Sequence, residues 1–150
     1  MSPKVWLVLG AILAGLSVYA GAYRSHSLER KLIAEWEQSP ESERNHDLGV
    51  KKQLDNFDIG VRYQMIHAFA LIVVGIMAQL APGRWWLFAG LSFLVGEVLF
   101  PGALYGLVFT GDERCKAAVP IGGVLFILGW VCVAAGCLVA KFEPQLPSAT

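Results

Sequence analysis

Charged residues are scarce in this sequence, and neither sign predominates. Only 16% of the 150 residues are charged, and twelve Lys and Arg balance twelve Asp and Glu. An average soluble domain carries roughly a quarter charged residues. No basic run interleaved with aromatic residues is present, so the usual pattern for binding a nucleic-acid backbone is missing. We therefore exclude nucleic acid as a partner and disfavour an ordinary soluble domain.

Patterns that carry chemistry are also missing. Cys115, Cys132 and Cys137 form no Cys-x-x-Cys pair, and the last two lie in an apolar block, where cysteine acts as a small packing residue. Neither His26 nor His67 has a partner at His-x-x-x-His or Glu-x-x-His spacing, which disfavours a local metal site. We recognise no serine with a paired base, no working pair of carboxylates and no phosphate-binding glycine loop. We expect neither an enzyme nor a bound cofactor.

Long apolar stretches are what the sequence has instead. Hydrophobic residues make up 55% of the chain and gather into four blocks, each near the roughly 20 residues that a helix needs to cross a bilayer. We expect a single all-α domain in the lipid bilayer, an up-down bundle of four transmembrane helices. The expected segments are spans at 5–23, 58–80, 85–109 and 119–140, a polar interfacial segment at 24–57 and a tail at 141–150.

Residues 24–56 form the only sizeable polar stretch, with six of the twelve basic residues. Within it, Leu28, Leu32, Ile33 and Trp36 give a one-sided apolar stripe. This pattern predicts a short amphipathic helix lying in the membrane interface, with Trp36 at headgroup depth and a polar loop after Pro40. Two further interface anchors are expected where the third block opens, Trp85 and Trp86.

Three ionisable residues enter the apolar blocks. Arg62 lies about one turn into the second block, and His67 lies roughly 12 Å deep at 1.5 Å per residue. Glu97 stands near the middle of the third block, where Pro101 cannot donate to its backbone carbonyl. Since a charge inside a bilayer is costly and usually paired, we predict a buried contact between His67 and Glu97, directly or through a water. The alternative is polar bonding between helices without any transport role.

A second histidine, His26, is expected at the same membrane face as His67. Two histidines from two helices could ligate a metal or haem, or pass protons. In the simpler interpretation, each histidine donates a hydrogen bond to a neighbouring helix backbone, to Tyr63 or to Tyr105. The sequence leaves these alternatives open.

Glycines recur at helix-packing intervals. Gly102 and Gly106 predict a flat face on the third span, and Gly122, Gly129 and Gly136 fall every seven residues on the fourth. Such seams allow close helix contact.

Four segments together resemble the signature of a known family. They are Gly21-Ala22-Tyr23-Arg24-Ser25-His26-Ser27-Leu28, Tyr63-Gln64-Met65-Ile66-His67-Ala68-Phe69-Ala70-Leu71, Leu99-Phe100-Pro101-Gly102-Ala103-Leu104-Tyr105, and Pro120-Ile121-Gly122-Gly123-Val124 through Gly129-Trp130. In order and spacing they look like the domain-of-unknown-function 423 family of small bacterial inner-membrane proteins, relatives of transmembrane protein 256.

This resemblance implies a four-helix membrane protein and a bacterial inner-membrane location, but no activity. The positions that match the family's motifs are His26, Tyr63, His67, Gly102, Tyr105, Pro120, Gly122, Gly123, Gly129 and Trp130. Relatives usually show Gly-Ala-His where this chain has Arg24-Ser25-His26, and an apolar residue in place of Glu97. They also show Ser-Gly-Ser in place of Pro101-Gly102-Ala103, and the 38–56 segment looks like an insertion.

We expect a non-catalytic membrane protein that works by packing, as a homo-oligomer or as an accessory subunit with other membrane proteins. The competing hypothesis is a small transporter or channel that uses His67, Glu97 and Arg62 for a proton or small ion. Orientation stays open, because eight Lys and Arg at one face against three at the other place the termini outside the cytoplasm, whereas the resemblance implies the reverse.

Overall fold

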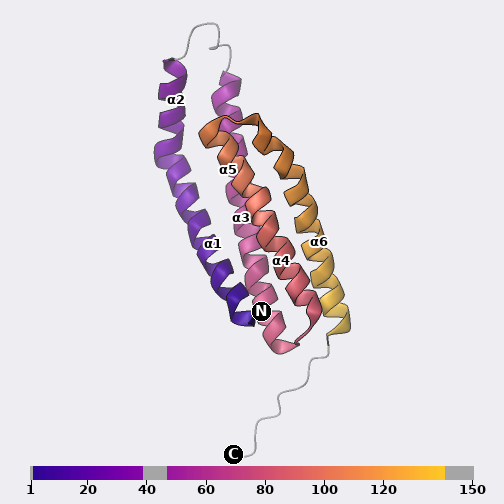
Figure 1. Ribbon diagram of the computed structural model, residues 1–150. Helices are drawn as coiled ribbons and strands as arrows, with labels where there is room; N and C mark the ends of the chain where they lie inside the picture. Colours follow the sequence, from indigo (N-terminus) through magenta and orange to yellow (C-terminus); the bar gives the residue numbers. More distant parts are fainter. Residues whose placement is uncertain (1, 39–46, 141–150) are drawn as a thin grey trace, which may run out of the picture.

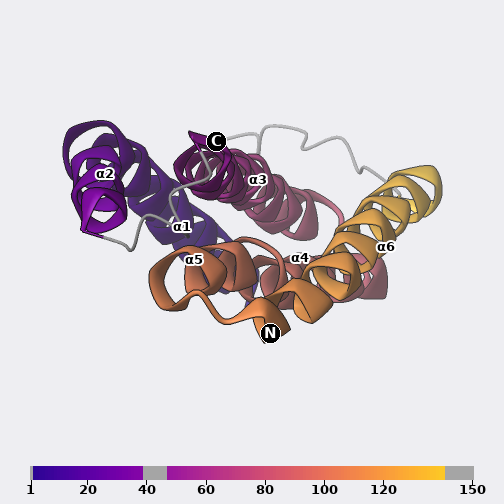
Figure 2. The same cartoon turned by 90° about the horizontal axis from the view of Figure 1, so that it is seen from above.

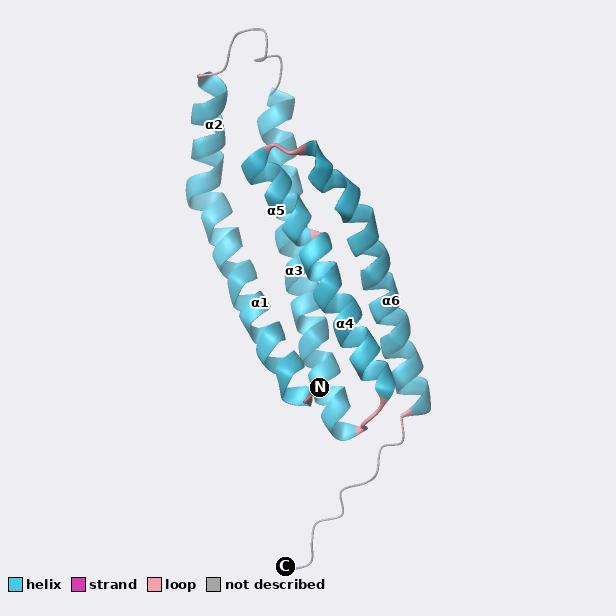
Figure 3. Ribbon diagram, in the orientation of Figure 1, coloured by secondary structure: helices cyan, strands magenta, loops and turns pink. Residues whose placement is uncertain are grey.

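The computed structural model describes residues 2–38 and 47–140, and helices make up nearly all of that part (Figure 3). Four apolar helical stretches are long enough to cross a membrane: Pro3–Glu37, Gly49–Leu80, Arg84–Thr110 and Glu113–Val139. They alternate in direction along the chain (Figure 1). The described residues contain no strand, and the predicted all-α bundle is confirmed.

The first span is longer than predicted. Helix α1 (Pro3–Tyr23) continues through a π-helical turn, η1 (Arg24–Leu28), into α2 (Glu29–Glu37) without leaving helical backbone angles. The predicted short helix therefore exists, but it extends α1 instead of forming a separate interfacial element (Figure 1). No glycine or proline interrupts the junction, and Leu28 and Leu32 are buried against α3 residues Leu54 and Phe57.

Helix α3 (Asp47–Leu80) begins before the expected residue 58, so much of the predicted polar segment is helical. Together α2 and the first turns of α3 project beyond the other helices as a hairpin (Figure 1). Trp36 lies about 18 Å along the helix from Arg24 at 1.5 Å per residue, which does not fit the predicted headgroup anchor. Up to residue 46, the loop that we predicted after Pro40 falls outside the residues that the structure describes. Residues 47–56 of the apparent insertion are helix, not loop.

The third span is interrupted near its middle. After the short connection of residues 81–83, helix α4 (Arg84–Leu99) is followed by Phe100 and then by α5 (Pro101–Thr110). Proline has no N–H to donate and its ring clashes with the preceding turn, so the helix expected at 85–109 breaks there. The chain keeps its direction, because the Phe100 N–H donates to the Gly96 carbonyl at 2.8 Å.

Helix α5 ends at Gly111, which has a φ of 67°, a left-handed conformation that favours glycine. A short 3-10 helix, η2 (Glu113–Ala117), then leads into α6 (Ala118–Val139). This last helix matches the span predicted at 119–140.

The four spans lie side by side in chain order. α1 packs mainly on α3, α6 packs mainly on α4, and α3 contacts both α4 and α5 (Figures 1 and 2). The two middle spans are therefore more buried than the two outer ones. Every span also carries large apolar side chains that are more than half exposed, as lipid contact requires: Leu16, Phe69, Val98 and Ile127.

The glycine seam on α6 packs against aromatic residues of α4 and its C-cap, through the rings of Trp86 and Phe93 and the backbone of Phe100. Added Cβ atoms would come within 2.6 Å of the Phe100 backbone nitrogen at Gly122 and 2.9 Å of the Trp86 ring at Gly136. Gly129 faces the Phe93 ring between them. The three aromatic residues recur every seven residues, as the three glycines do, so two antiparallel helices interlock along their length. The predicted α6 seam is confirmed, with a partner inside the chain.

The other glycine positions behave differently. Gly123 makes an ordinary contact with the Phe100 ring, 3.7 Å from an added Cβ. Gly102 meets only the carbonyl of Glu97 in its own span, and Gly106 faces the sulfur of Cys115 at 3.3 Å. The predicted Gly102/Gly106 seam against another span is therefore wrong for the described chain, because the break at Phe100 starts a new helix there.

Candidate functional site

Gln64 is the polar centre of the bundle. It is buried in α3, and its Nε2 donates a hydrogen bond to the Leu13 carbonyl of α1 at 3.0 Å. Its Oε1 accepts a hydrogen bond from the Tyr105 hydroxyl of α5 at 2.8 Å. Gly60 allows Tyr105 to approach, since an added Cβ would lie 2.8 Å from its ring. One amide thus joins three helices. The sequence analysis gave this role to no residue, although Gln64 is a polar side chain within an apolar block and was a visible signal.

A second bond between helices comes from Ser17, which was also missed. Its side chain is fully buried in α1, and its hydroxyl donates to the Val61 carbonyl of α3 at 2.9 Å. Together with Gln64, Ser17 fixes the rotation of α1 against α3. Serine is a usual hydrogen-bonding residue between membrane helices, and its position among small residues in the first block was the available signal.

His67 is buried and both of its ring nitrogens have partners. Nδ1 lies 2.8 Å from the Tyr63 carbonyl of its own helix, and Nε2 lies 3.3 Å from the indole nitrogen of Trp130 in α6. A carbonyl only accepts and an indole N–H only donates, so Nδ1 carries the proton and Nε2 accepts. One neutral tautomer satisfies both bonds. His67 thus donates to Tyr63, as the simpler interpretation allowed, but to the backbone carbonyl within its own helix, and its bond to another helix is one that it accepts from Trp130.

Aromatic side chains from three helices surround this imidazole. The His67 ring stacks on Phe126 of α6, with centroids 3.4 Å apart and planes 3° apart. Phe93 of α4 lies 5.5 Å away and Tyr63 lies 5.9 Å away, centroid to centroid. Because these rings come from α3, α4 and α6, the cluster holds together three spans around one histidine.

Glu97 is buried in α4, with 5% of its surface exposed. Within residues 2–38 and 47–140, its Oε1 atom has no hydrogen-bond partner. No bond joins it to His67 there either, because both nitrogens of His67 are already engaged by Tyr63 and Trp130. The direct His67–Glu97 contact that we predicted is thus wrong: α6 supplies the partner instead of α4.

Arg62 and His26 do not join this buried group. Arg62 is exposed on α3, and His26 is exposed on η1, where its backbone carbonyl accepts from Arg30 at 2.9 Å. The structure therefore does not bring His26 and His67 together. In the described part of the chain, no three His, Cys, Asp or Glu side chains are grouped as metal ligands would be.

An ion pair closes the bundle at the end of α1. Arg24 Nε lies 3.0 Å and 3.1 Å from the two carboxylate oxygens of Asp58 in α3, and its Nη1 lies 3.2 Å from Glu29. The sequence analysis assigned Arg24 no partner. It instead links the start of the projecting hairpin to α3.

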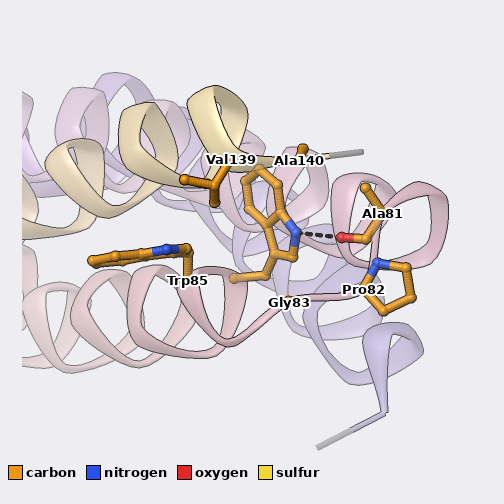
Figure 4. Close-up of a pocket in the computed structure, with 8 residues that line it drawn as sticks. Ala81, Pro82, Gly83, Trp85, Val139 and Ala140 are labelled. Carbon is orange, nitrogen blue, oxygen red and sulfur yellow. Dashed lines mark hydrogen bonds between the residues drawn. The ribbon is translucent and has the colours of Figure 1, made fainter. Parts of the chain in front are cut away.

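The two tryptophans at the opposite end differ from each other. Trp86 is buried, and its indole N–H donates to the Ala81 carbonyl at 2.7 Å, which fixes the α3–α4 connection (Figure 4). It is a core residue and not the predicted interface anchor. Trp85 is half-buried and lines a cavity of about 240 Å³ with Pro82 and Val139 (Figure 4), so its prediction as an anchor stays untested.

Comparisons with known proteins agree with this architecture. The family described as "Protein of unknown function (DUF423)" matches residues 20–123. A UPF0382 membrane protein of Staphylococcus saprophyticus is 34% identical, over 89% of this chain and 96% of its own length. The UPF0382 membrane protein YwdK of Bacillus subtilis is 35% identical, over 87% and 93%. One from Haemophilus influenzae is 32% identical, over 91% and 95%. No solved structure matches the chain.

Proposed function

Because the chain belongs to the DUF423 family of membrane proteins, we propose that it is a non-catalytic packing component of the bacterial membrane, acting as a homo-oligomer or as an accessory subunit. One observation carries this proposal. Four polar side chains are buried in the described residues, and three of them (Ser17, Gln64 and His67) are used in hydrogen bonds that hold the helices together. Polar side chains that are used to bond membrane helices to one another leave few others that could take part in a reaction.

The packing of the seams limits where a partner could bind. The glycines Gly122, Gly129 and Gly136 of α6 are covered by aromatic residues of the same chain, so a partner would not use that face. The surfaces that stay free are the exposed apolar sides of the spans and the projecting α2–α3 hairpin (Figure 1). A protein with a four-span body and one polar projection could act either as a homo-oligomer or as an accessory subunit.

Native purification tests this proposal. We expect the tagged chain, extracted in a mild detergent, to have a native mass above that of the 16.3 kDa monomer, either as a multiple of it or with other membrane proteins at fixed stoichiometry. The same sample after dissociation in a harsh detergent is the control. A stable wild-type monomer, without protein partners at every detergent concentration tested, would contradict both forms.

Glu97 favours a second function, a small proton or ion transporter. A buried carboxyl oxygen without a partner is unusual, and ionisable groups inside a membrane often mark a proton or ion path. Arg62, which we grouped with it, is exposed and does not converge on the same place. Of the three residues that we grouped for transport, Glu97 and His67 are buried.

Reconstitution into liposomes separates the two functions. From the packing function we expect proton or cation flux equal to that of protein-free liposomes for the wild type, Glu97→Gln and His67→Ala alike. Glu113→Gln is the matched control, because Glu113 is exposed in η2, at the very end of the fourth span. Flux in the wild type and in Glu113→Gln that falls tenfold or more in Glu97→Gln would establish transport instead.

A further inference from the structure

Glu97 is the one carboxylic acid that is buried among the described residues. It lies thirteen residues from each end of the span Arg84–Thr110, about 20 Å at 1.5 Å per residue, and that whole span is described. In the described part of the chain no Lys or Arg is buried, and none forms an ion pair with Glu97. A carboxylate this deep in a membrane is costly unless it is paired or protonated. Glu97 therefore needs a positive charge that no described side chain supplies.

Packing between α1 and α4 places Glu97 level with the Leu13 carbonyl. An added Cβ on Gly90 would lie 2.6 Å from the Trp6 ring, so these two residues face each other. α1 and α4 run in the same direction (Figure 1), and Leu13 and Glu97 each lie seven residues further along. Seven residues are close to two helical turns, a rise of about 10.5 Å. Leu13 and Glu97 therefore lie on the same faces as Trp6 and Gly90, at one shared level.

The polar centre of the bundle meets α1 at this level. The Leu13 carbonyl accepts from Gln64 Nε2, and Gln64 Oε1 accepts from the Tyr105 hydroxyl. That hydroxyl is also near enough to the Glu97 carboxyl for the two groups to interact electrostatically. Each of the carbonyl, amide and hydroxyl oxygens has a further lone pair. Four oxygen-bearing groups, from α1, α3, α4 and α5, thus gather in one buried region.

The end of α4 adds to the negative potential there. Glu97 is in the last turn of α4, which contains no basic residue, and the C-terminal end of a helix favours a cation. Pro101 has no N–H with which to satisfy the Glu97 carbonyl. In secondary transporters, interrupted membrane helices with such carbonyl ends coordinate Na⁺ or protons. The break at Phe100 therefore makes this place more favourable for a cation than an unbroken helix would.

We propose that this region binds one Na⁺ ion, held by the Glu97 carboxylate and by oxygens of Leu13, Gln64 and Tyr105. Oxygen ligands suit hard cations, and a monovalent ion cancels a single carboxylate, whereas a divalent ion would leave an excess charge in the hydrocarbon. A proton on Glu97 would also cancel the charge, but it needs at most one of the other oxygens, so the gathering of four favours a metal ion. The inference is independent of the proposed function, because a bound ion holds the spans together without having to cross the membrane.

Thermal unfolding of the detergent-solubilised full chain tests this inference. NaCl is exchanged for N-methyl-D-glucamine chloride at constant ionic strength and one fixed pH, because this organic cation is too large for a buried site. A ligand that binds only the native state raises the melting temperature as its concentration rises. We expect a saturable rise with Na⁺ for the wild type and an apparent affinity at least tenfold weaker in Glu97→Gln. Tyr105→Phe, which removes one neutral oxygen, should weaken the affinity less.

Ser17→Ala is the matched control. Ser17 is a buried polar residue one turn further along α1 than Leu13, and its hydroxyl bonds to Val61. The variant should therefore melt at a lower temperature than the wild type but keep the same dependence on Na⁺.

Binding of radioactive Na⁺ to the wild type, at one ion per chain, is the second measurement, and it does not depend on the folding of any variant. Lack of saturable Na⁺ binding, an equal response to the two cations, or an unchanged dependence on Na⁺ in Glu97→Gln would overturn the proposal. So would a melting temperature that responds to pH but not to Na⁺, the result expected if Glu97 binds only a proton.

Discussion

Gly122→Ala is expected to destabilise the protein by about 2–3 kcal/mol, in the upper range for overpacking of a tight core. The added Cβ would lie 2.6 Å from the backbone nitrogen of Phe100 and 2.8 Å from its Cβ. Backbone atoms cannot turn aside as the end of a flexible side chain can. The clash would push α6 away from the α4–α5 break and loosen the whole seam. Reversible unfolding in mixed detergent, followed by circular dichroism, measures the loss.

Gly123→Ala is the matched control for this prediction. It adds the same methyl group one residue further along α6, where the nearest atoms of the Phe100 ring lie 3.7 Å away, an ordinary contact. Alanine also favours helix over glycine by up to about 1 kcal/mol. We therefore expect Gly123→Ala to be neutral or slightly stabilising. Equal destabilisation by the two substitutions would show that Gly122 is not a close-contact position.

Gln64→Leu is expected to cost about 2 kcal/mol, from two lost hydrogen bonds of roughly 0.6–1.7 kcal/mol each between membrane helices. The substitution leaves the Leu13 carbonyl and the Tyr105 hydroxyl without their partner. Leucine has a similar volume, so little of the loss should come from packing. The same unfolding assay gives the difference, and cross-linking between α1 and α3 should report looser contact.

A double-mutant cycle with Tyr105→Phe isolates one of the two bonds. We expect a coupling energy of about 1 kcal/mol between Gln64 and Tyr105, because they share the bond of 2.8 Å. Gln79→Leu is the control, since Gln79 is exposed and bonds only within its own helix, to Gly75 at 3.4 Å; its effect should stay under about 0.5 kcal/mol. Additive effects of Gln64→Leu and Tyr105→Phe would contradict the bridge.

The position of each span could be predicted because it depends on local composition. An uninterrupted apolar stretch of sufficient length must be helical in lipid, whatever it packs against. Pro101 could also have predicted the break at Phe100, since its missing N–H is a local property. The early start of α3 could not be predicted in this way. Its first turns are polar, so local composition did not predict a membrane helix there. The helix forms where Leu54 and Phe57 are buried against Leu28 and Leu32 of the first span.

Partners of the buried polar groups were beyond sequence reasoning. His67 and Glu97 were paired by depth alone, but the rotation of a helix about its axis decides which neighbour a side chain meets. These spans are apolar all round, so their sequences carry little signal for which face turns inward. The same limit hid Gln64 and the burial of Trp86.

By itself, therefore, the sequence determined a membrane protein of four helices, its order of spans and the glycine spacing on α6, because length, apolarity and spacing act along one chain. Only the tertiary structure decided that aromatic residues of the third span cover the α6 glycines, that Trp130 and not Glu97 bonds to His67, and that Gln64 joins three helices. Those outcomes depend on the rotation and distance of one helix relative to another, which the packing of all the helices together sets.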